Sequence, residues 1–211
     1  RSVAATKTYT GQLLTFYLLA MALGGGIDRK ALEQLPEWAD QALRLNGEVE
    51  QAVQRYLFMR HTVVVARGLN YANAFEFGLK LMETSYVLAE RFSAADFLHG
   101  PIAIVDSMFP VFLFAPAGPS WQSMKEMMEK LKGLQAESLV FTDKSNRDIS
   151  KKTGRVLEIP ASLAAKGSVP ADLYTPIPYI VPAQLFAAHL ATLKGLDPDQ
   201  PRGLRKVTQT L

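Results

Sequence analysis

Three residues that can carry acid–base chemistry follow one another at helical spacing in the stretch AFEFGLKLMETSYVLAERFSAADFLHGP, residues 74–101. Glu76, Lys80 and Glu83 are four and three residues apart, so a helix places them on one face. A carboxylate on such a face can act as a base, and an ammonium can stabilise developing negative charge. The same spacing also suits an exposed stripe in which Glu76 and Lys80 form an ion pair of about 0.3–0.5 kcal/mol.

A histidine and a lysine elsewhere in the chain are further candidates. His99 stands in FLHGP, where Gly100 and Pro101 turn the chain directly after an imidazole that can exchange protons near neutral pH. Lys206 stands in RGLRKVTQTL near the end of the sequence. A tail lysine is usually a solvated charge, but a mobile ammonium can also meet a carbonyl substrate as an amine nucleophile.

Other motifs predict less chemistry. His61 begins an expected strand and His189 lies in an apolar helical segment, so both are interpreted as structural, and the histidines lack metal-ligand spacing. No metal site is therefore expected. The turns RGLN and APAGPS are not nucleotide-binding loops, and only Ser120, at the start of an expected helix, offers a weak anion site.

Composition narrows the class of protein. The 211 residues are 48% hydrophobic and 20% charged, with a formal net charge of +3 that is spread along the chain, so nucleic acid is not an expected partner. The absence of cysteine excludes disulfides and a cysteine nucleophile and fits a cytoplasmic protein. The run LLTFYLLAMALGGG is too short to span a bilayer and predicts a buried helix, not a membrane segment.

The elements that must position these residues alternate between strand and helix. Thr8 or Thr10 is expected to cap a first helix, Asp28 a second, and Pro36 to open a third. Strands are predicted at 61–68, 111–117, 138–143 and 156–160, and helices at 71–88, 121–134 and 179–193. This alternation predicts an α/β fold with a doubly wound parallel sheet flanked by helices.

Three segments in order resemble the sugar isomerase (SIS) family, in particular the isomerase part of glucosamine-6-phosphate synthases and their stand-alone relatives. They are SVAATKTYTGQ, RGLNYANAFEFGLKLMETSYVLAERFSAADFLHGPIAIVD and DPDQPRGLRKVTQT. The resemblance implies a flavodoxin-like three-layer α/β/α fold. It makes 1–26 the final helix of a first SIS lobe, 27–60 connecting helices, 61–195 a second SIS domain and 196–211 a tail that closes over the active site.

The same resemblance implies a role for each catalytic candidate. Glu83 matches the carboxylate that moves a proton between C1 and C2 of a sugar through an enediol. His99 matches the histidine that assists ring opening and comes from the neighbouring subunit of a homodimer. Lys206 matches the tail lysine that meets the carbonyl of the open-chain ketose.

Supporting positions and departures follow from the resemblance as well. Glu76 and Lys80 match supporting residues on the same helix face, and Val3 and Ala4 match residues whose backbone borders the sugar. Ala5 replaces a common serine, and the Ser and Thr loops that hold the sugar phosphate have no counterpart among these residues.

The implied function is an aminosugar-phosphate isomerase module acting on fructose 6-phosphate or glucosamine 6-phosphate. Its phosphosugar chemistry needs no metal or organic cofactor, because a Glu, a Lys and a His supply the base, the charge stabilisation and the acid. The synthetic and deaminating directions both stay open. A different class of function, a SIS module that binds a phosphosugar as a regulatory signal without turnover, is the alternative.

Overall fold

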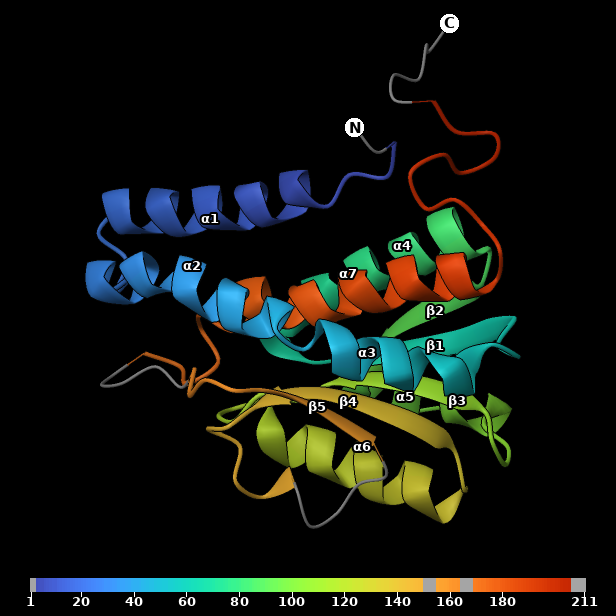
Figure 1. Ribbon diagram of the computed structural model, residues 1–211. Coiled ribbons are helices and arrows are strands. Elements are labelled where there is room, and N and C mark those ends of the chain that lie inside the picture. Colours follow the sequence, from blue (N-terminus) through green and yellow to red (C-terminus); the bar gives the residue numbers. More distant parts are fainter. Residues whose placement is uncertain (1–2, 150–154, 164–168, 206–211) are drawn as a thin grey trace, which may run out of the picture.

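The computed structural model describes residues 3–149, 155–163 and 169–205, and these contain one five-stranded parallel sheet (Figure 1). Its strands lie in the order β2-β1-β3-β4-β5, which is the flavodoxin-like order of doubly wound sheets. The predicted fold class is therefore confirmed. The strands are β1 (His61–Ala66), β2 (Leu88–Ser93), β3 (Pro110–Phe114), β4 (Glu137–Asp143) and β5 (Arg155–Ile159).

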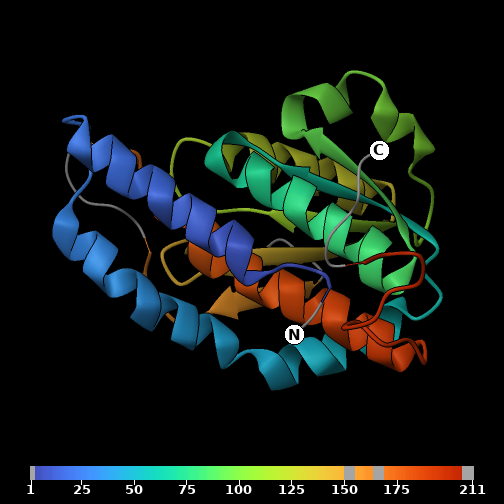
Figure 2. The same cartoon turned by 90° about the horizontal axis from the view of Figure 1, so that it is seen from above.

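Helices cover both faces of the sheet (Figure 1). The helices α3 (Asn46–Val53), α4 (Tyr71–Ser85) and α7 (Pro176–Leu193) pack on one face together with the end of α2 (Arg29–Leu43). On the other face lie α5 (Ala94–Leu98) and α6 (Trp121–Gly133). The first helix, α1 (Lys7–Ala22), crosses above α2 and α7 as an additional layer (Figure 2).

Alternation along the strands explains the two cores. Val64 of β1 faces the core under α4 and α7, whereas Val63 and Val65 face the core under α6. On the first side Phe77 of α4 meets the ring of Phe112 edge-on, with centroids 5.1 Å apart. Burying such a side chain contributes about 1.5–3 kcal/mol. This packing fixes which face of α4 points away from the sheet.

Four of the strands lie where the sequence predicts them, but β2 was not predicted. This edge strand carries Glu90 and Arg91, and Ala89 is its only buried residue, so it lacks a continuous apolar run. The preceding helix was expected to run to residue 88 and instead ends at Ser85. Tyr86 takes a left-handed conformation, with φ 54°, that terminates it.

Three expectations about the N-terminal helices are wrong. Neither Thr8 nor Thr10 caps the first helix, because both lie inside α1. Pro36 does not open a new helix, because α2 runs through it, beginning after Asp28, which accepts a hydrogen bond from the Lys30 amide as predicted. The first helix begins at Lys7, and of its side chains only that of Tyr17 is buried. It is therefore not the expected buried helix. None of the helices described is long and apolar enough to cross a membrane.

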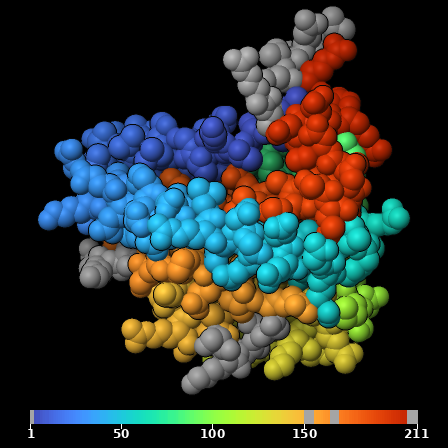
Figure 3. Space-filling model, in the orientation of Figure 1, coloured from blue at the N-terminus to red at the C-terminus, as the bar shows by residue number. Residues whose placement is uncertain are grey.

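The N-terminal segment and the segment after α7 meet on one side of the molecule. The backbone amide of Val3 donates to the carbonyl of Asp199 at 3.2 Å. In the space-filling view the red C-terminal segment stands beside the start of the blue first helix (Figure 3). Two segments that are far apart in sequence thus lie side by side near α4 and α7.

Candidate active site

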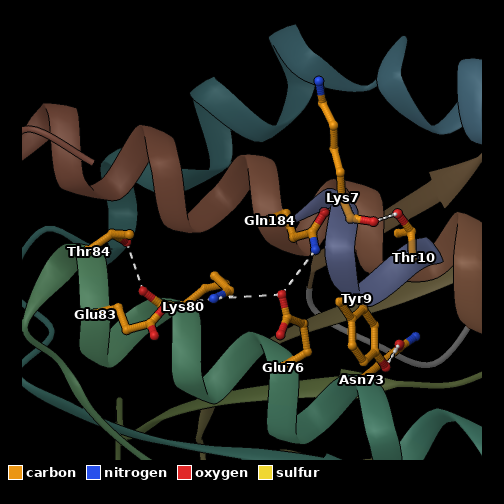
Figure 4. Close-up of polar contacts among 9 residues, drawn as sticks. All are labelled: Lys7, Tyr9, Thr10, Asn73, Glu76, Lys80, Glu83, Thr84 and Gln184. Atoms are coloured by element: carbon orange, nitrogen blue, oxygen red, sulfur yellow. Dashed lines mark hydrogen bonds and ion pairs between the residues drawn. The ribbon is translucent and has the colours of Figure 1, made fainter. Parts of the chain in front are cut away.

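The predicted helix face forms a cluster of charged side chains (Figure 4). The Lys80 Nζ lies 2.6 Å from Glu83 Oε2 and 3.9 Å from Glu76 Oε1. The Glu76 carboxylate also accepts a hydrogen bond from Gln184 Nε2 of α7 at 3.2 Å. One ammonium is therefore shared between two carboxylates.

This cluster is not an exposed stripe. The side chains of Lys80 and Glu76 are 5% and 7% exposed, and that of Glu83 is 23% exposed. Burial raises the pKa of Glu76, and the nearby Lys80 charge and the Gln184 hydrogen bond only partly oppose this. The interpretation as a solvated ion pair is thus wrong, and Glu83 is the carboxylate most open to a ligand.

The packing of α4 determines the direction in which Lys80 points. Phe77 and Leu81, one residue away from Glu76 and Lys80, are fully buried in the core against the sheet. The charged face consequently points the other way, toward α1 and α7. The Thr84 hydroxyl donates to the Lys80 carbonyl at 2.8 Å, which satisfies the backbone of the same turn.

A pocket of about 510 Å³ opens beside the cluster, between α1, α2, α4 and α7. Its volume falls in the range of small-molecule sites. The polar and charged residues that line it include Thr6, Lys7, Lys80, Thr84, Gln184 and Asp199. Ala4 also lines it and is buried, so the structure brings together two of the predicted site residues, Ala4 and Lys80. Val3 is fixed to the same rim through its hydrogen bond to Asp199.

A second hollow of about 490 Å³ lies on the far side of Glu76, which lines it together with Tyr9 and Arg91. The Tyr9 hydroxyl donates to Asn73 Oδ1 at 2.7 Å. Burial, and then the Glu76 carboxylate, raise the pKa of Tyr9, so this hydroxyl remains protonated at neutral pH. Glu76 therefore sits between two hollows and is enclosed by groups from α1, α4 and α7.

The structure does not bring His99 to this cluster. His99 is exposed and follows α5, whose buried residues Ala94 and Phe97 pack on the face of the sheet opposite to α4. The other two histidines have the expected structural surroundings. His61 lies 5.4 Å from the Phe109 ring, and His189 Nε2 is hydrogen-bonded to Asn46 at 2.9 Å.

The remaining two candidates are Lys206 and Ser120. Lys206 lies outside the described residues. At the start of α6 the Ser120 hydroxyl donates to Asp172 Oδ2 at 3.1 Å, and both side chains are buried. The weak anion site expected at Ser120 therefore holds a carboxylate of the chain itself.

Sequence reasoning missed two residues that touch the cluster. Gln184 is the only polar residue between Val181 and Ala188, and an isolated amide in an apolar helical run was a signal that it could have a buried partner. Tyr9 lies in the polar start of α1, and nothing in its spacing connects it to residues more than 60 positions away.

The fold and the cluster together define a class of protein. It is an α/β protein with a doubly wound sheet and, on the helix after the first strand, a buried lysine shared by two carboxylates beside a pocket of ligand size. The sequence profile of the SIS domain matches residues 59–194, and the chain belongs to this family.

Relatives of known name and structure agree with this assignment. The chain is 38% identical over 211 residues to glutamine–fructose-6-phosphate aminotransferase (isomerizing) of Pyrococcus horikoshii, covering 97% of this chain and 33% of the relative. Identity to the Thermotoga maritima protein of the same name is 35%, with 97% and 34% coverage. The chain thus spans about a third of the length of these relatives.

A solved structure shows a similar arrangement. The C-terminal domain of glucosamine-fructose-6-phosphate aminotransferase from Francisella tularensis superimposes with a TM-score of 0.82 at 28% identity. The similarity covers 94% of this chain and 57% of that structure. The similar relatives are therefore enzymes named for an amino transfer to a sugar phosphate with isomerization.

Proposed function

We propose that this chain is the isomerase module of an aminosugar-phosphate enzyme that acts on fructose 6-phosphate or glucosamine 6-phosphate. The observation that carries the proposal is the buried Lys80 ammonium, 2.6 Å from one carboxylate and 3.9 Å from another, beside a ligand-sized pocket. The relatives' names supply the substrate class. The cluster supplies the groups that a carbon-acid proton transfer needs.

In this proposal Glu83 is the base that moves the proton between C1 and C2 of the opened sugar. Its side chain keeps 23% of its surface exposed, so a substrate can reach the carboxylate, while Lys80 holds it in one position. A carboxylate that a neighbouring ammonium orients in this way can accept the proton from carbon. The enediol forms when that proton leaves carbon, and returning it to the adjacent carbon completes the isomerisation.

Lys80 and Glu76 have supporting roles. The Lys80 ammonium can stabilise negative charge that develops on the enediol oxygen, an interaction that is stronger in a buried site than in water. Glu76 is itself held by Gln184 and prevents the ammonium from turning away from the pocket. Ala4 and Val3 would form the wall against which the sugar lies.

Ring opening requires a further acid–base group in addition to those that the proton transfer uses. We assign this role to His99 of a neighbouring subunit in a homodimer. The exposure of His99 and its place on the opposite face of the sheet support donation to another copy over a role in its own site. Lys206, four residues after Arg202, is assigned to the open-chain carbonyl at the end of a closing tail.

The division of the chain belongs to the same proposal. Residues 1–26 would complete a first lobe, 27–60 connect, 61–195 form the second SIS domain, and 196–211 form the tail. The large apolar side chains that α1 leaves exposed, Leu14, Phe16, Leu18, Leu19 and Leu23, support its assignment to a further packing unit. The groups that bind the substrate phosphate would come from that unit.

The test is turnover by the full-length protein that carries this chain. Fructose 6-phosphate with ammonia, and separately glucosamine 6-phosphate, would be followed by NMR. Interconversion in either direction is expected. Tight phosphosugar binding without interconversion would overturn the enzyme and support the regulatory, non-catalytic alternative.

A further inference from the structure

A third pocket, of about 450 Å³, lies away from the cluster, near the ends of α4 and α7. Arg60, Tyr86, Lys194 and Arg202 line it together with Leu57, Phe58, Met59, Ser85 and Leu196. Three of these nine residues are cations and none is acidic. The proposed function gives the three cations no individual role, so their grouping in one pocket needs an explanation of its own.

The cations are held in the pocket by specific contacts. Lys194 Nζ donates to the Met59 carbonyl at 2.7 Å, which fixes the ammonium against the residue before Arg60. Burial lowers the pKa of Lys194, and the charge of Arg60 lowers it further. These two like charges are therefore close enough to oppose one another.

Arg202 joins the pocket to the segment that follows α7. Its guanidinium carbon lies 4.0 Å from the centroid of the Tyr86 ring, and its backbone amide donates to the Tyr86 hydroxyl at 2.9 Å. Tyr86 is fixed in turn by its left-handed backbone at the end of α4. The tail thus reaches this pocket only four residues before Lys206.

Local negative charge does not balance these cations. Within residues 3–149, 155–163 and 169–205, no carboxylate forms an ion pair with Arg60, Lys194 or Arg202. The carbonyl ends of α4 and α7 each carry about half a negative charge. Two such helix ends together offset about one of the three positive charges. The remaining positive charge favours the binding of an anion in the pocket.

We propose that this pocket binds the phosphate group of a small anion, which fastens the tail between Arg60, Lys194 and Arg202. Guanidinium and ammonium groups make charge-assisted hydrogen bonds to phosphate oxygens. The Tyr86 hydroxyl accepts from the Arg202 amide, and a hydroxyl can donate a hydrogen bond as well. The inference goes beyond the proposed function, because it concerns a second anion site on another part of the chain.

The experiment is an NMR titration of the ¹⁵N-labelled chain with inorganic phosphate at low ionic strength, repeated with glucose 6-phosphate. Saturable shifts are expected at the amides of Arg60, Tyr86 and Leu196. Shifts only at Ala4 and Gln184 would place the anion in the pocket beside Lys80 and overturn the proposal. Binding of both compounds would identify a general phosphate site, whereas binding of only one would identify the occupant.

Two variants with the same change of charge separate a specific site from general attraction. Arg60→Gln should weaken phosphate binding about tenfold or more, the effect of losing a hydrogen bond to a charged group. Arg29→Gln removes an exposed arginine of α2 and should leave the affinity unchanged within about twofold, as expected for a distant surface charge. Equal affinity of the two variants, or no saturable shifts in the unmodified chain, would refute the site.

Limited proteolysis tests independently whether the bound phosphate holds the tail. Phosphate should slow tryptic cleavage after Arg202 and Arg205 in the unmodified chain and in Arg29→Gln, but not in Arg60→Gln. An equal effect of phosphate on all three proteins would show that the pocket does not hold the tail.

Discussion

Two glutamates in this molecule are equally buried, but their surroundings shift their pKa values in opposite directions. Glu76 on α4 and Glu137 at the start of β4 are each 7% exposed. Glu137 Oε1 accepts hydrogen bonds from Arg55 Nε and Arg155 Nε, both at 2.8 Å. Among the described residues, the partners of the Glu76 carboxylate are the shared Lys80 at 3.9 Å and the Gln184 amide. The first carboxylate is neutralised by two cations, and the second competes with Glu83 for one.

The pKa directions follow from this difference. Burial alone raises the pKa of Glu137, but hydrogen bonds from Arg55 and Arg155 and their charges outweigh it, so the pKa is lowered. At Glu76 burial prevails and the pKa is raised. An ion cluster that is fully paired supports the fold, whereas an under-compensated one beside a pocket indicates a candidate site for chemistry.

The largest effect is expected from Lys80→Met. It leaves two carboxylates without their cation, and breaking such a buried pair costs about 3–5 kcal/mol of the free energy of unfolding. Urea unfolding would measure the loss. The double variant Lys80→Met with Glu76→Gln should recover much of it, because no unpaired buried charge then remains at Glu76. A loss below about 1 kcal/mol, typical of surface pairs, would contradict the assigned burial.

Glu137→Gln should have a smaller effect on stability and none on chemistry. Removing the charge weakens two hydrogen bonds, and half-exposed arginines can regain water, so the expected cost is about 1–2 kcal/mol. Turnover per folded molecule should be unchanged. A lower turnover at full folding would show that this cluster, too, contributes to the site.

The pH dependence of stability should have opposite signs in the two clusters. Ionised Glu137 stabilises the fold above its ordinary pKa of 4.5, and this contribution is lost as pH falls through its lowered folded value. For Glu76 the folded pKa is raised, so the wild-type chain loses stability as pH rises from 4.5 through that value. Urea midpoints of Glu137→Gln and Glu76→Gln relative to wild type would test this. Parallel pH profiles would contradict the comparison.

The smallest effect is expected from Arg29→Gln. Arg29 and Glu33 have the same i,i+4 separation as Glu76 and Lys80, but their side chains are 81% and 62% exposed. Exposed helical pairs contribute about 0.3–0.5 kcal/mol. A urea midpoint close to that of the wild-type chain is the expected result, and a loss comparable to that of Lys80→Met would remove the distinction between exposed and buried pairs.

Much of the fold follows from local sequence pattern. The β-branched run of β1 and the apolar runs of β3 and β4 are buried on both sides, so each strand can be recognised without knowledge of its neighbours. The edge strand β2 could not be recognised in this way, because it carries Glu90 and Arg91 and is buried at one position only. Likewise, the local sequence does not show that α2 continues through Pro36, with Leu32 and Leu35 buried before it and Ala42 buried after it.

The site was predictable only in part. Helical spacing places Glu76, Lys80 and Glu83 on one face, but whether that face is exposed depends on α1 and α7, which are far away in sequence. The carboxylate that Lys80 contacts at 2.6 Å is Glu83 and not the i,i+4 partner Glu76. That choice, and the contact of Gln184 with Glu76, are set by packing between helices and not by spacing within one.

We expect Glu83 to move a proton on carbon and Glu137 only to support the fold. The direct measurement is deuterium incorporation from D₂O at C1 and C2 of the sugar phosphate, catalysed by the full-length protein. Glu83→Gln should slow incorporation about 10²–10⁴-fold, the contribution of a general base, with the protein still folded. Glu137→Gln should exchange at the wild-type rate. Exchange at the wild-type rate in Glu83→Gln would contradict the proposed role of Glu83 as the base.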